Sequence, residues 1–375
     1  MSKNYNKILS PFTFPVSGIT VDSRVVLAPM TTFSGNADGT VSDAEIAYYK
    51  ERNRSAGLLL TACAYVLPQG KAFPGQIGVH ADEMIPSLKR IADTLKANGG
   101  KALLQIHHGG RMCPPEELPD GQSVSASAVA ALREGAQVPR EMTETEIEET
   151  IAAYGEAARR AAEAGFDGVE IHGANTYLIQ QFFSPHSNRR TDKWGGSLEK
   201  RMAFPLAVVD AVKASVKKSA GRPFIVGYRI SPEETENPGI TIQDTLALAE
   251  TLAQKGLDYL HVSVMDFWAG SMRDEKDTES RAKLIYEKVG RGLPVIGVGS
   301  ITSPEQAEEV LDSGISMIAL GRELLIDPQW LDKIKSGKPE SIEKALDVHN
   351  REGLKIPAPM WNGLLSRTGW LPLKE

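Results

Sequence analysis

The order of apolar and polar positions along the chain predicts short buried strands that alternate with amphipathic helices. Each strand segment is a brief run rich in Val, Ile, Leu and Ala that ends at a proline, a glycine or a polar residue. Such segments occupy residues 25–30, 58–62, 102–106, 168–171, 224–230, 259–264, 294–297 and 317–320, and helical spacing occupies 43–56, 82–97, 143–164, 199–219, 241–255, 278–291 and 303–313. Eight strand segments in this rhythm favour a closed parallel (β/α)8 TIM barrel, with a doubly wound open sheet as the structural alternative.

Two stretches interrupt the rhythm and predict additions to the barrel. Residues 8–21 alternate Pro, Phe and Gly, which indicates a short N-terminal hairpin that closes the bottom of the barrel. Residues 107–142, rich in Pro, Gly, Ser and Ala, follow the third strand and are too long for an ordinary connection, so we expect a lid. Directly after it, Thr143 with Glu146 three residues later predicts a capping box at the start of a helix.

The fourth strand runs into a group of polar residues that predicts an active site. The apolar run ends at His172, and Asn175 and Tyr177 follow. Active sites of (β/α)8 barrels form at the carboxyl ends of strands. A His and an Asn three residues apart can donate hydrogen bonds to one anionic oxygen, and a Tyr two residues later can give up a phenolic proton. Each residue alone has a structural alternative, but the three together favour chemistry on a negatively charged oxygen.

The last two strands end in a pattern that predicts a phosphate site. Gly299 and Ser300 follow the seventh strand, and Gly321 and Arg322 follow the eighth, before a short turn at residues 323–326. In this fold, backbone N–H groups and a helix N-terminus meet a dianion in these two loops, and an arginine adds a bidentate charged contact. The alternative is that the glycines only make tight turns. No Gly-x-Gly-x-x-Gly sequence follows a strand, so a Rossmann nucleotide site has no support.

Composition and charge argue against several classes of protein. The chain carries 42 Lys and Arg against 48 Asp and Glu, a net charge of −6, so no basic field favours nucleic acid. No apolar run approaches the roughly 20 residues that span a bilayer. Cys63 and Cys113 are too few for a disulfide framework, and the N-terminus lacks a signal-like core. We therefore expect a soluble cytoplasmic protein with a single domain over residues 1–375, and with no nucleic-acid or membrane partner.

Six short segments are weak signals singly, but together and in this order along the chain they are highly specific for one family. They are Ala-Pro-Met-Thr at 28–31, Gln-Ile-His-His-Gly-Gly-Arg at 105–111, Pro-Arg-Glu-Met-Thr at 139–143, Ile-His-Gly-Ala-Asn-Thr-Tyr-Leu-Ile at 171–179, Ser-Asn-Arg-Arg-Thr-Asp-Lys-Trp-Gly-Gly-Ser at 187–197 and Gly-Arg-Glu-Leu-Leu at 321–325. In these segments the chain resembles the Old Yellow Enzyme family of FMN-dependent ene-reductases. The resemblance runs from about Pro11 to Pro328.

The resemblance implies FMN as cofactor, NADH or NADPH as reductant, and ping-pong transfer of hydride to the C=C bond of an enone-type small molecule. It implies that His172 and Asn175 bind the carbonyl oxygen of the substrate and that Tyr177 protonates the α-carbon. Gln105 and Arg229 resemble the groups that bind the pyrimidine edge of the flavin, where Arg229 stabilises negative charge. The alternatives are a satisfied core amide for Gln105 and a surface ion pair for Arg229.

The same resemblance assigns further positions beside the cofactor. Pro29 and Met30 would lie against the flavin, Thr31 would donate a hydrogen bond to its O4 atom, and Ala64 would be the small residue over the ring. For Thr31 and Ala64 the alternative is plain packing. The two loops that end the last strands would bind the phosphate of FMN.

Departures from the family bear on the substrate side. In one branch of the family a cysteine and a tyrosine occupy the places of Thr31 and Phe33. Because Phe33 cannot donate a hydrogen bond, we expect a different substrate range. Phe267 and Trp268 follow the sixth strand and either wall the pocket or pack. That branch also extends a C-terminal arginine into a neighbouring subunit. Here the tail, about 345–375, either does so in a homo-oligomer or packs on its own barrel, through Trp361, Arg367 and Trp370.

Three functions remain after this reading. An NAD(P)H-dependent FMN ene-reductase is favoured. A related flavin barrel, a tRNA dihydrouridine synthase, would need a basic face that the net charge of −6 does not offer. The third is a flavin-binding carrier or sensor without turnover. Longer relatives hold an iron–sulfur centre, but two cysteines cannot supply its four thiolates, so we expect no metal.

Overall fold

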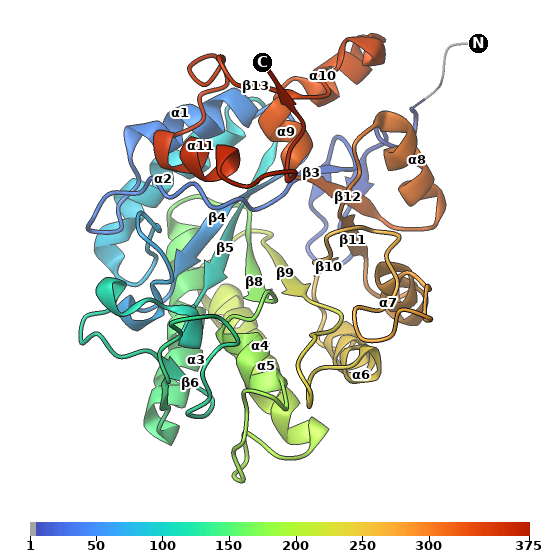
Figure 1. Ribbon diagram of the computed structural model, residues 1–375. Coiled ribbons are helices and arrows are strands. Elements are labelled where there is room, and N and C mark those ends of the chain that lie inside the picture. Colours follow the sequence, from blue (N-terminus) through green and yellow to red (C-terminus); the bar gives the residue numbers. More distant parts are fainter. Residues whose placement is uncertain (1–4) are drawn as a thin grey trace.

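Eight parallel strands close into a barrel in the computed structural model of this protein, which describes residues 5–375 (Figure 1). Neighbouring strands pair around the ring in the order β10-β11-β12-β3-β4-β5-β8-β9. They are β3 (Val25–Leu27), β4 (Leu58–Tyr65), β5 (Lys101–His107), β8 (Gly168–Gly173), β9 (Ile225–Ile230), β10 (Tyr259–Val262), β11 (Val295–Val298) and β12 (Met317–Leu320). The closed ring confirms the TIM barrel, and the open-sheet alternative is wrong, since an open sheet would leave two edges unpaired.

β3 and β4 differ most in length from the prediction. β3 ends at Leu27 rather than at residue 30, because Pro29 has no N–H group to give to a ladder. β4 continues past residue 62, since residues 63–65 resume parallel pairing with β5 after an irregularity that follows Leu60. The longer β4 adds a further backbone segment to the carboxyl end of the barrel.

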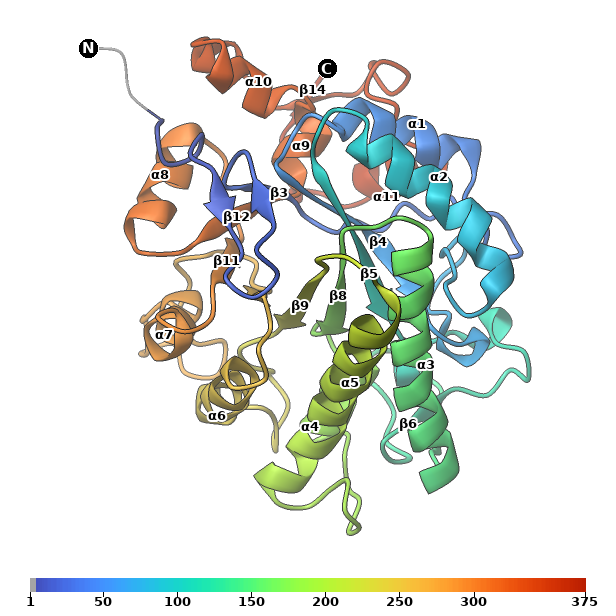
Figure 2. The ribbon, with the colours of Figure 1, turned by 180° about the vertical axis from the view of Figure 1, so that it is seen from behind.

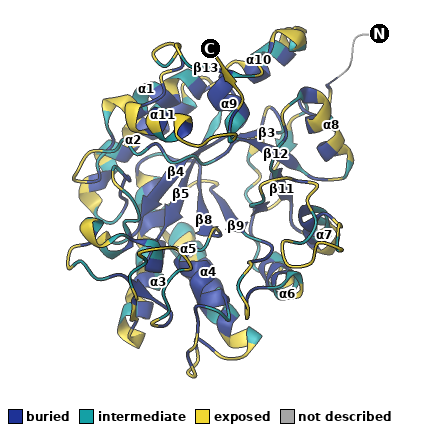
Figure 3. Ribbon diagram, in the orientation of Figure 1, coloured by how far each residue is buried: buried dark blue, intermediate teal, exposed yellow. Residues whose placement is uncertain are grey.

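An outer ring of helices covers the strands (Figures 1 and 2). In α2 the buried Leu88, Ile91, Ala92 and Leu95 recur at helical spacing, which is how an amphipathic helix packs its apolar face on a sheet. Figure 3 shows the result, with buried strands inside and exposed helix faces outside. The seven predicted helices are confirmed with ends shifted by a few residues: α1 (Asp43–Arg52), α2 (Ile85–Lys96), α3 (Glu144–Glu163), α5 (Leu198–Ser219), α6 (Ile242–Ala253), α7 (Arg281–Val289) and α8 (Pro304–Asp312).

The N-terminal hairpin fills the amino end of the barrel. β1 (Phe12–Thr13) and β2 (Thr20–Val21) pair antiparallel, and Figure 2 shows them in dark blue on the side turned to the viewer. Phe14, which follows β1, is fully buried, and its ring centroid lies 5.9 Å from that of Tyr259. Phe14 shares one apolar cluster with inward-facing strand residues such as Leu58. The prediction that this hairpin closes the bottom of the barrel is confirmed.

The sequence pattern misses four short helices, and one of them replaces the turn expected at 323–326. Every residue of α4 is buried, including Gln180 and Gln181, so its six residues show no apolar face opposite a solvent-exposed one. The tail also contains a two-stranded parallel sheet of β13 (Leu346–Asp347) and β14 (Leu373–Lys374). The four helices are α4 (Leu178–Phe183), α9 (Arg322–Ile326), α10 (Trp330–Lys335) and α11 (Ala358–Leu365).

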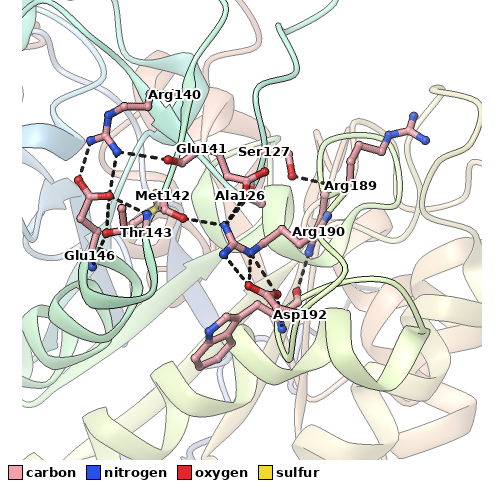
Figure 4. A network of polar contacts seen from close by, with 12 residues as sticks. Ala126, Ser127, Arg140, Glu141, Met142, Thr143, Glu146, Arg189, Arg190 and Asp192 are labelled. Carbon is pink, nitrogen blue, oxygen red and sulfur yellow. Dashed lines mark hydrogen bonds and ion pairs between the residues drawn. The ribbon is translucent and has the colours of Figure 1, made fainter.

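A buried arginine is one of the contacts that anchor the insertion at 107–142 to α4 and the loop after it. It includes the paired strands β6 (Val124–Ser125) and β7 (Arg140–Glu141). Arg190, on the loop after α4, donates from Nη1 to the carbonyl oxygens of Ala126 at 3.1 Å and Met142 at 2.7 Å (Figure 4). Asp192 accepts from Nη2 of the same guanidinium at 2.6 Å. This ion pair therefore fastens the insertion at two backbone positions.

The capping box at the start of α3 is present and can be tested. The Oγ1 atom of Thr143 accepts from the N–H of Glu146 at 3.3 Å, and Oε2 of Glu146 accepts from the N–H of Thr143 at 2.8 Å (Figure 4). Thr143→Ala should lower the free energy of unfolding by about 1 kcal/mol in urea titrations, since a helix donor loses its partner. Thr145→Ala, at an exposed threonine of the same turn, is the control and should cost less than about 0.5 kcal/mol. Equal losses in the two variants would contradict the role of the box.

Candidate active site

Buried polar side chains line the inside of the barrel near its carboxyl end. Successive side chains of a strand point to opposite faces, so Gln105 and His107 of β5 share a face, as do Glu170 and His172 of β8. The register places Gln105 opposite Glu170, and His172 opposite Arg229 of β9. All five side chains are buried. The three strands that carry them lie side by side in Figure 1.

His172 is held as a neutral hydrogen-bond donor. Its Nδ1 atom accepts from the N–H of Ala174 at 3.3 Å, so the ring proton resides on Nε2. Burial lowers the pKa of His172 well below its ordinary value, and the neighbouring His107 and Arg229 lower it further. His172 therefore offers one N–H group and no positive charge.

Asn175 follows on the loop after β8 and presents its amide nitrogen. Its backbone has a left-handed φ of 57°, and its N–H donates to the hydroxyl of Ser231 at 2.9 Å. Its Oδ1 atom accepts from the hydroxyl of Ser263 at 2.9 Å. Because the oxygen is turned to the serines, Nδ2 is the group that this exposed side chain offers to a ligand.

Tyr177 completes the group as a protonated phenol. Its ring makes edge contacts with the rings of His172 and His107, at centroid distances of 5.1 and 4.2 Å. Burial raises the pKa of Tyr177 well above its ordinary value, so the phenol keeps its proton at neutral pH. The structure thus brings His172 and Tyr177 into contact, with Asn175 on the loop between them.

His107 is a site residue that the sequence reasoning did not single out. The Oε1 atom of Gln76 accepts from the N–H of Ala72 at 2.7 Å, which leaves its Nε2 group to donate to Nδ1 of His107 at 3.0 Å. The ring proton of His107 therefore resides on Nε2, which has no hydrogen-bond partner among residues 5–375. Burial lowers the pKa of His107 to about 3. The signal in the sequence was its position two residues after Gln105, on the same strand face.

Gln105 and Arg229 are the two further predicted site residues on these strands. Gln105 donates from Nε2 to Glu170 at 2.7 Å. The alternative of a satisfied core amide therefore holds for one N–H group of this side chain. Arg229 is buried, so the surface ion-pair alternative is wrong. Within the described chain its Nε group has no hydrogen-bond partner. Because buried donors are normally paired, the unpaired N–H groups of Arg229 and His107 fit acceptor atoms of a bound molecule.

A cavity of about 130 Å³ runs from Arg229 to the loops after β11 and β12. Nη2 of Arg322 donates to the hydroxyl of Ser300 at 3.0 Å, which itself donates to the carbonyl oxygen of Met265 at 2.9 Å. Gly299 has a φ of 117°, and a Cβ atom there would lie 2.9 Å from the N–H of Asp266, so only glycine fits. The predicted loop residues therefore share one site, which is lined by Gly299, Ser300, Gly321, Arg322, Pro29 and Met30.

The remaining predicted residues lie at different depths. Thr31 is half-buried on the loop after β3. Ala64 is fully buried and pairs in register with Ile106, and both belong to the core between strands and helices. The packing alternative therefore describes the Ala64 side chain, and a ring in the barrel could meet only its backbone. The ring of Phe33 packs edge-on against Phe73 at 5.4 Å, and Phe73 lies 6.5 Å from the ring of His107.

The aromatic pair after β10 divides between core and surface. Phe267 is 1% exposed, and its ring lies so close to Gly297 that a Cβ atom there would be 2.8 Å away. The packing alternative describes Phe267, because its ring is turned into the protein. Trp268 is 42% exposed and contacts Phe267 edge-on at 4.8 Å.

The C-terminal tail packs on its own barrel. The carbonyl oxygen of Trp370 accepts from Nη1 of Arg322 at 3.3 Å, and Trp370 lines the cavity. The guanidinium of Arg367 lies 5.6 Å from the Trp370 ring, and Trp361 is buried in the core. Trp361 and Trp370 thus pack on the barrel of the same chain, while the extension of a C-terminal arginine into a neighbouring subunit stays a prediction.

The cysteines and the wider chain add two observations. Cys63 and Cys113 are unpaired and buried, and burial raises the pKa of both thiols, that of Cys63 to about 12. Residues 5–375 contain no group of three or more His, Cys, Asp or Glu side chains that could hold a metal ion. Over the same residues, no helix has the length and apolar character needed to cross a membrane.

Comparison with known proteins identifies the family. The sequence profile of the NADH:flavin oxidoreductase / NADH oxidase family matches residues 7–341. The chain belongs to this family. A probable NADH-dependent flavin oxidoreductase of Bacillus subtilis is 48% identical over 375 residues and matches over the full length of both chains. The NADH:fumarate oxidoreductase of Klebsiella pneumoniae is 46% identical over 95% of this chain, which spans only 38% of that protein's length.

Solved structures of flavin oxidoreductases agree with this assignment. Morphinone reductase aligns with a TM-score of 0.76 at 27% identity, over 92% of this chain and 93% of that one. The old yellow enzyme homologue of Zymomonas mobilis aligns with a TM-score of 0.76 at 26% identity, over 88% and 93% of the chains. The resemblance to the Old Yellow Enzyme family is confirmed. The site described above is therefore that of an oxidoreductase that uses a flavin and a nicotinamide reductant.

The buried histidines of this flavin oxidoreductase predict how its stability depends on pH. Burial lowers the pKa values of both His107 and His108 to about 3, whereas an unfolded histidine titrates near 6.5. At pH values between about 3 and 6.5, these histidines bind protons in the unfolded chain but not in the folded chain. The free energy of unfolding should therefore fall as pH drops below about 6.5, by up to about 1.4 kcal/mol per pH unit for each histidine.

Urea titrations at pH 7.5 and 5.5 measure this dependence. His107→Phe removes one of the two groups, so its loss of stability between the two pH values should be smaller than that of the wild type. An equal loss in both proteins would show that His107 accepts a proton in the folded state.

Proposed function

We propose that this protein is an FMN-dependent NAD(P)H oxidoreductase that reduces the activated C=C bond of α,β-unsaturated carbonyl compounds or similar electrophiles. One observation carries the proposal: a single cavity joins the buried cation Arg229 to the loops at Arg322. His172 lies in register with Arg229 on the neighbouring strand, and Tyr177 contacts His172. In this proposal the phosphate of FMN occupies the outer end of the cavity at Arg322, and the ring extends past Arg229 toward the proposed acid.

FMN suits the charges along this cavity. At the outer end, Arg322 is a cation able to bind a phosphate dianion, and the glycine at 299 keeps side-chain atoms away from it. At the inner end, Arg229 carries a positive charge. Two strands along the barrel, Gln105 of β5 has an amide oxygen left to accept a hydrogen bond. We propose that Thr31, half-buried on the loop after β3, donates from its hydroxyl to the ring. The residues proposed to bind FMN are Pro29, Met30, Thr31, Gln105, His172, Arg229, Gly299, Ser300, Gly321, Arg322 and the backbone of Ala64.

The side chains above the ring divide the chemistry between them. Bound FMN supplies the hydride. His172 and Asn175 donate hydrogen bonds to the carbonyl oxygen of the substrate, which draws electron density away from its C=C bond. Tyr177 gives its phenolic proton to the α-carbon. Because burial keeps His172 neutral, it binds the oxygen without competing as an acid. NAD(P)H and the substrate occupy the same position in turn, which gives ping-pong kinetics.

Aromatic side chains shape the proposed substrate pocket. Phe33 and Phe73 form an apolar wall beside His107. Trp268 stands at the exposed rim, and Phe267 supports it from the core. An apolar wall facing polar donors suits a planar molecule with one oxygen-bearing end.

A flavin carrier or sensor remains the competing function, and a spectrum separates the two. An enzyme that turns over loses its yellow absorbance with NAD(P)H and regains it when cyclohexenone is added without oxygen. A carrier bleached by a chemical reductant stays bleached after the enone is added. That second outcome would overturn the proposal.

The cofactor itself is the next prediction. Acid-released flavin should migrate as FMN and not as FAD, because the cavity ends at one phosphate site. Arg322→Ala should raise the dissociation constant of FMN at least about tenfold, since a hydrogen bond to a charged group contributes about 1.5–3 kcal/mol. Arg291→Ala, at an exposed position away from the cavity, is the control. Equal FMN affinity in the two variants would place the phosphate elsewhere.

The half-reactions test the role of Tyr177. Tyr177→Phe should slow reoxidation by an enone by about 10²–10⁴-fold, because the general acid is lost. Flavin reduction by NAD(P)H should stay nearly unchanged, since hydride delivery to the flavin needs no phenol. Stopped-flow absorbance measures both steps separately. If both slowed alike, Tyr177 would have a structural role instead.

A further inference from the structure

Glu170 is a buried carboxylate in the middle of the proposed flavin site, and the proposed function gives it no task. It lies on β8 two residues before His172 and is 0% exposed. By strand alternation its side chain points into the barrel, as that of His172 does. A carboxylate without water is costly, so its partners require explanation.

Three donors from two strands, β5 and β10, meet the two oxygens of Glu170. Oε1 accepts from Nε2 of Gln105 at 2.7 Å. Oε2 accepts from the hydroxyl of Tyr259 at 3.0 Å and from Nδ1 of His261 at 2.9 Å. The net effect on the pKa of Glu170 is a lowering, because His261 and Arg229 outweigh the effect of burial. Glu170 is therefore an anion at neutral pH.

The bond to Glu170 fixes the amide of Gln105. It uses one N–H of the amide and decides on which side the nitrogen lies. The second N–H and the oxygen remain as an adjacent donor and acceptor. That pair is complementary to the alternating C=O and N–H groups on the pyrimidine edge of a flavin.

The charge of Glu170 acts on the same end of the cavity. Arg229 lies one strand away and lines the cavity, and it forms no ion pair with any residue of the described chain. Its N–H groups stay open to a ligand, while Glu170 offsets part of its positive charge across the interior. Two-electron reduction adds negative charge to a flavin ring, so a nearby carboxylate disfavours the reduced form.

We propose that Glu170 is a positioning residue of the flavin site, whose carboxylate holds the Gln105 amide and whose charge lowers the reduction potential of the bound flavin. This inference rests on the proposed function, since it takes FMN to bind with its ring at Arg229. Glu170 would thereby help to set the reduction potential of the bound flavin.

Glu170→Gln removes the charge and keeps the shape. The new amide oxygen can still accept from Gln105, and His261 can move its proton to Nε2 and accept from the new amide nitrogen. The affinity of the FMN-loaded protein for reduced over oxidised FMN should rise at least tenfold, which for a two-electron couple is about 30 mV upward in midpoint potential. Spectroelectrochemical titration measures this without any substrate.

Tyr259→Phe is the matched variant, and it should shift the midpoint potential in the opposite direction. It keeps the carboxylate but removes one donor that neutralises it, so the midpoint potential should fall below that of the wild type. A purely structural role of the cluster would move both variants in the same direction, and that result, or an unchanged potential in Glu170→Gln, would overturn this inference alone. A wild-type protein that binds no FMN would overturn the proposed function and this inference with it.

Discussion

The register among β5, β8, β9 and β10 is the constraint on which the chemistry of this protein depends. Each strand gives alternate side chains to the barrel interior, so a slip of one residue would exchange the whole inner set. In β5 such a slip would put Ile106 in the place of Gln105, and in β8 it would put Ile171 in the place of His172. The closed ring of hydrogen bonds prevents this, because every strand is held from both sides. The same strands thus supply side chains to the site on one face and to the apolar core on the other.

Within that frame, neighbours fix the proton positions of the polar groups. The Ala174 N–H sets the tautomer of His172, and the Gln76 amide sets that of His107. Glu170 sets the orientation of Gln105. These groups therefore need little reorganisation when a ligand arrives, which is the condition for effective electrostatic stabilisation. The cost is a set of buried imidazoles that stay neutral and weaken the fold in acid.

The sequence was informative wherever a residue's role follows from its place at a strand end. The barrel and the positions of His172, Tyr177 and Arg322 could be predicted because buried runs and the polar residues after them are local signals. Glu170 could not be assigned, since its partners His261 and Tyr259 are 91 and 89 residues away along the chain. The inner face of β4 could not be predicted either, because the irregularity after Leu60 changes which side chains point inward.

Phe14 closes the amino end of the barrel and so limits the routes by which reactants can reach the interior. With the hairpin ring packed against Tyr259, Phe14 blocks the amino end of the described barrel interior, whereas His172 and Arg229 lie toward the carboxyl end. Under the proposed function, a hydride donor and a hydride acceptor that both need the space at Arg229 would share the opening at the carboxyl end. In the proposed ping-pong reaction the first would leave before the second arrives, so topology as well as affinity would set the order of events.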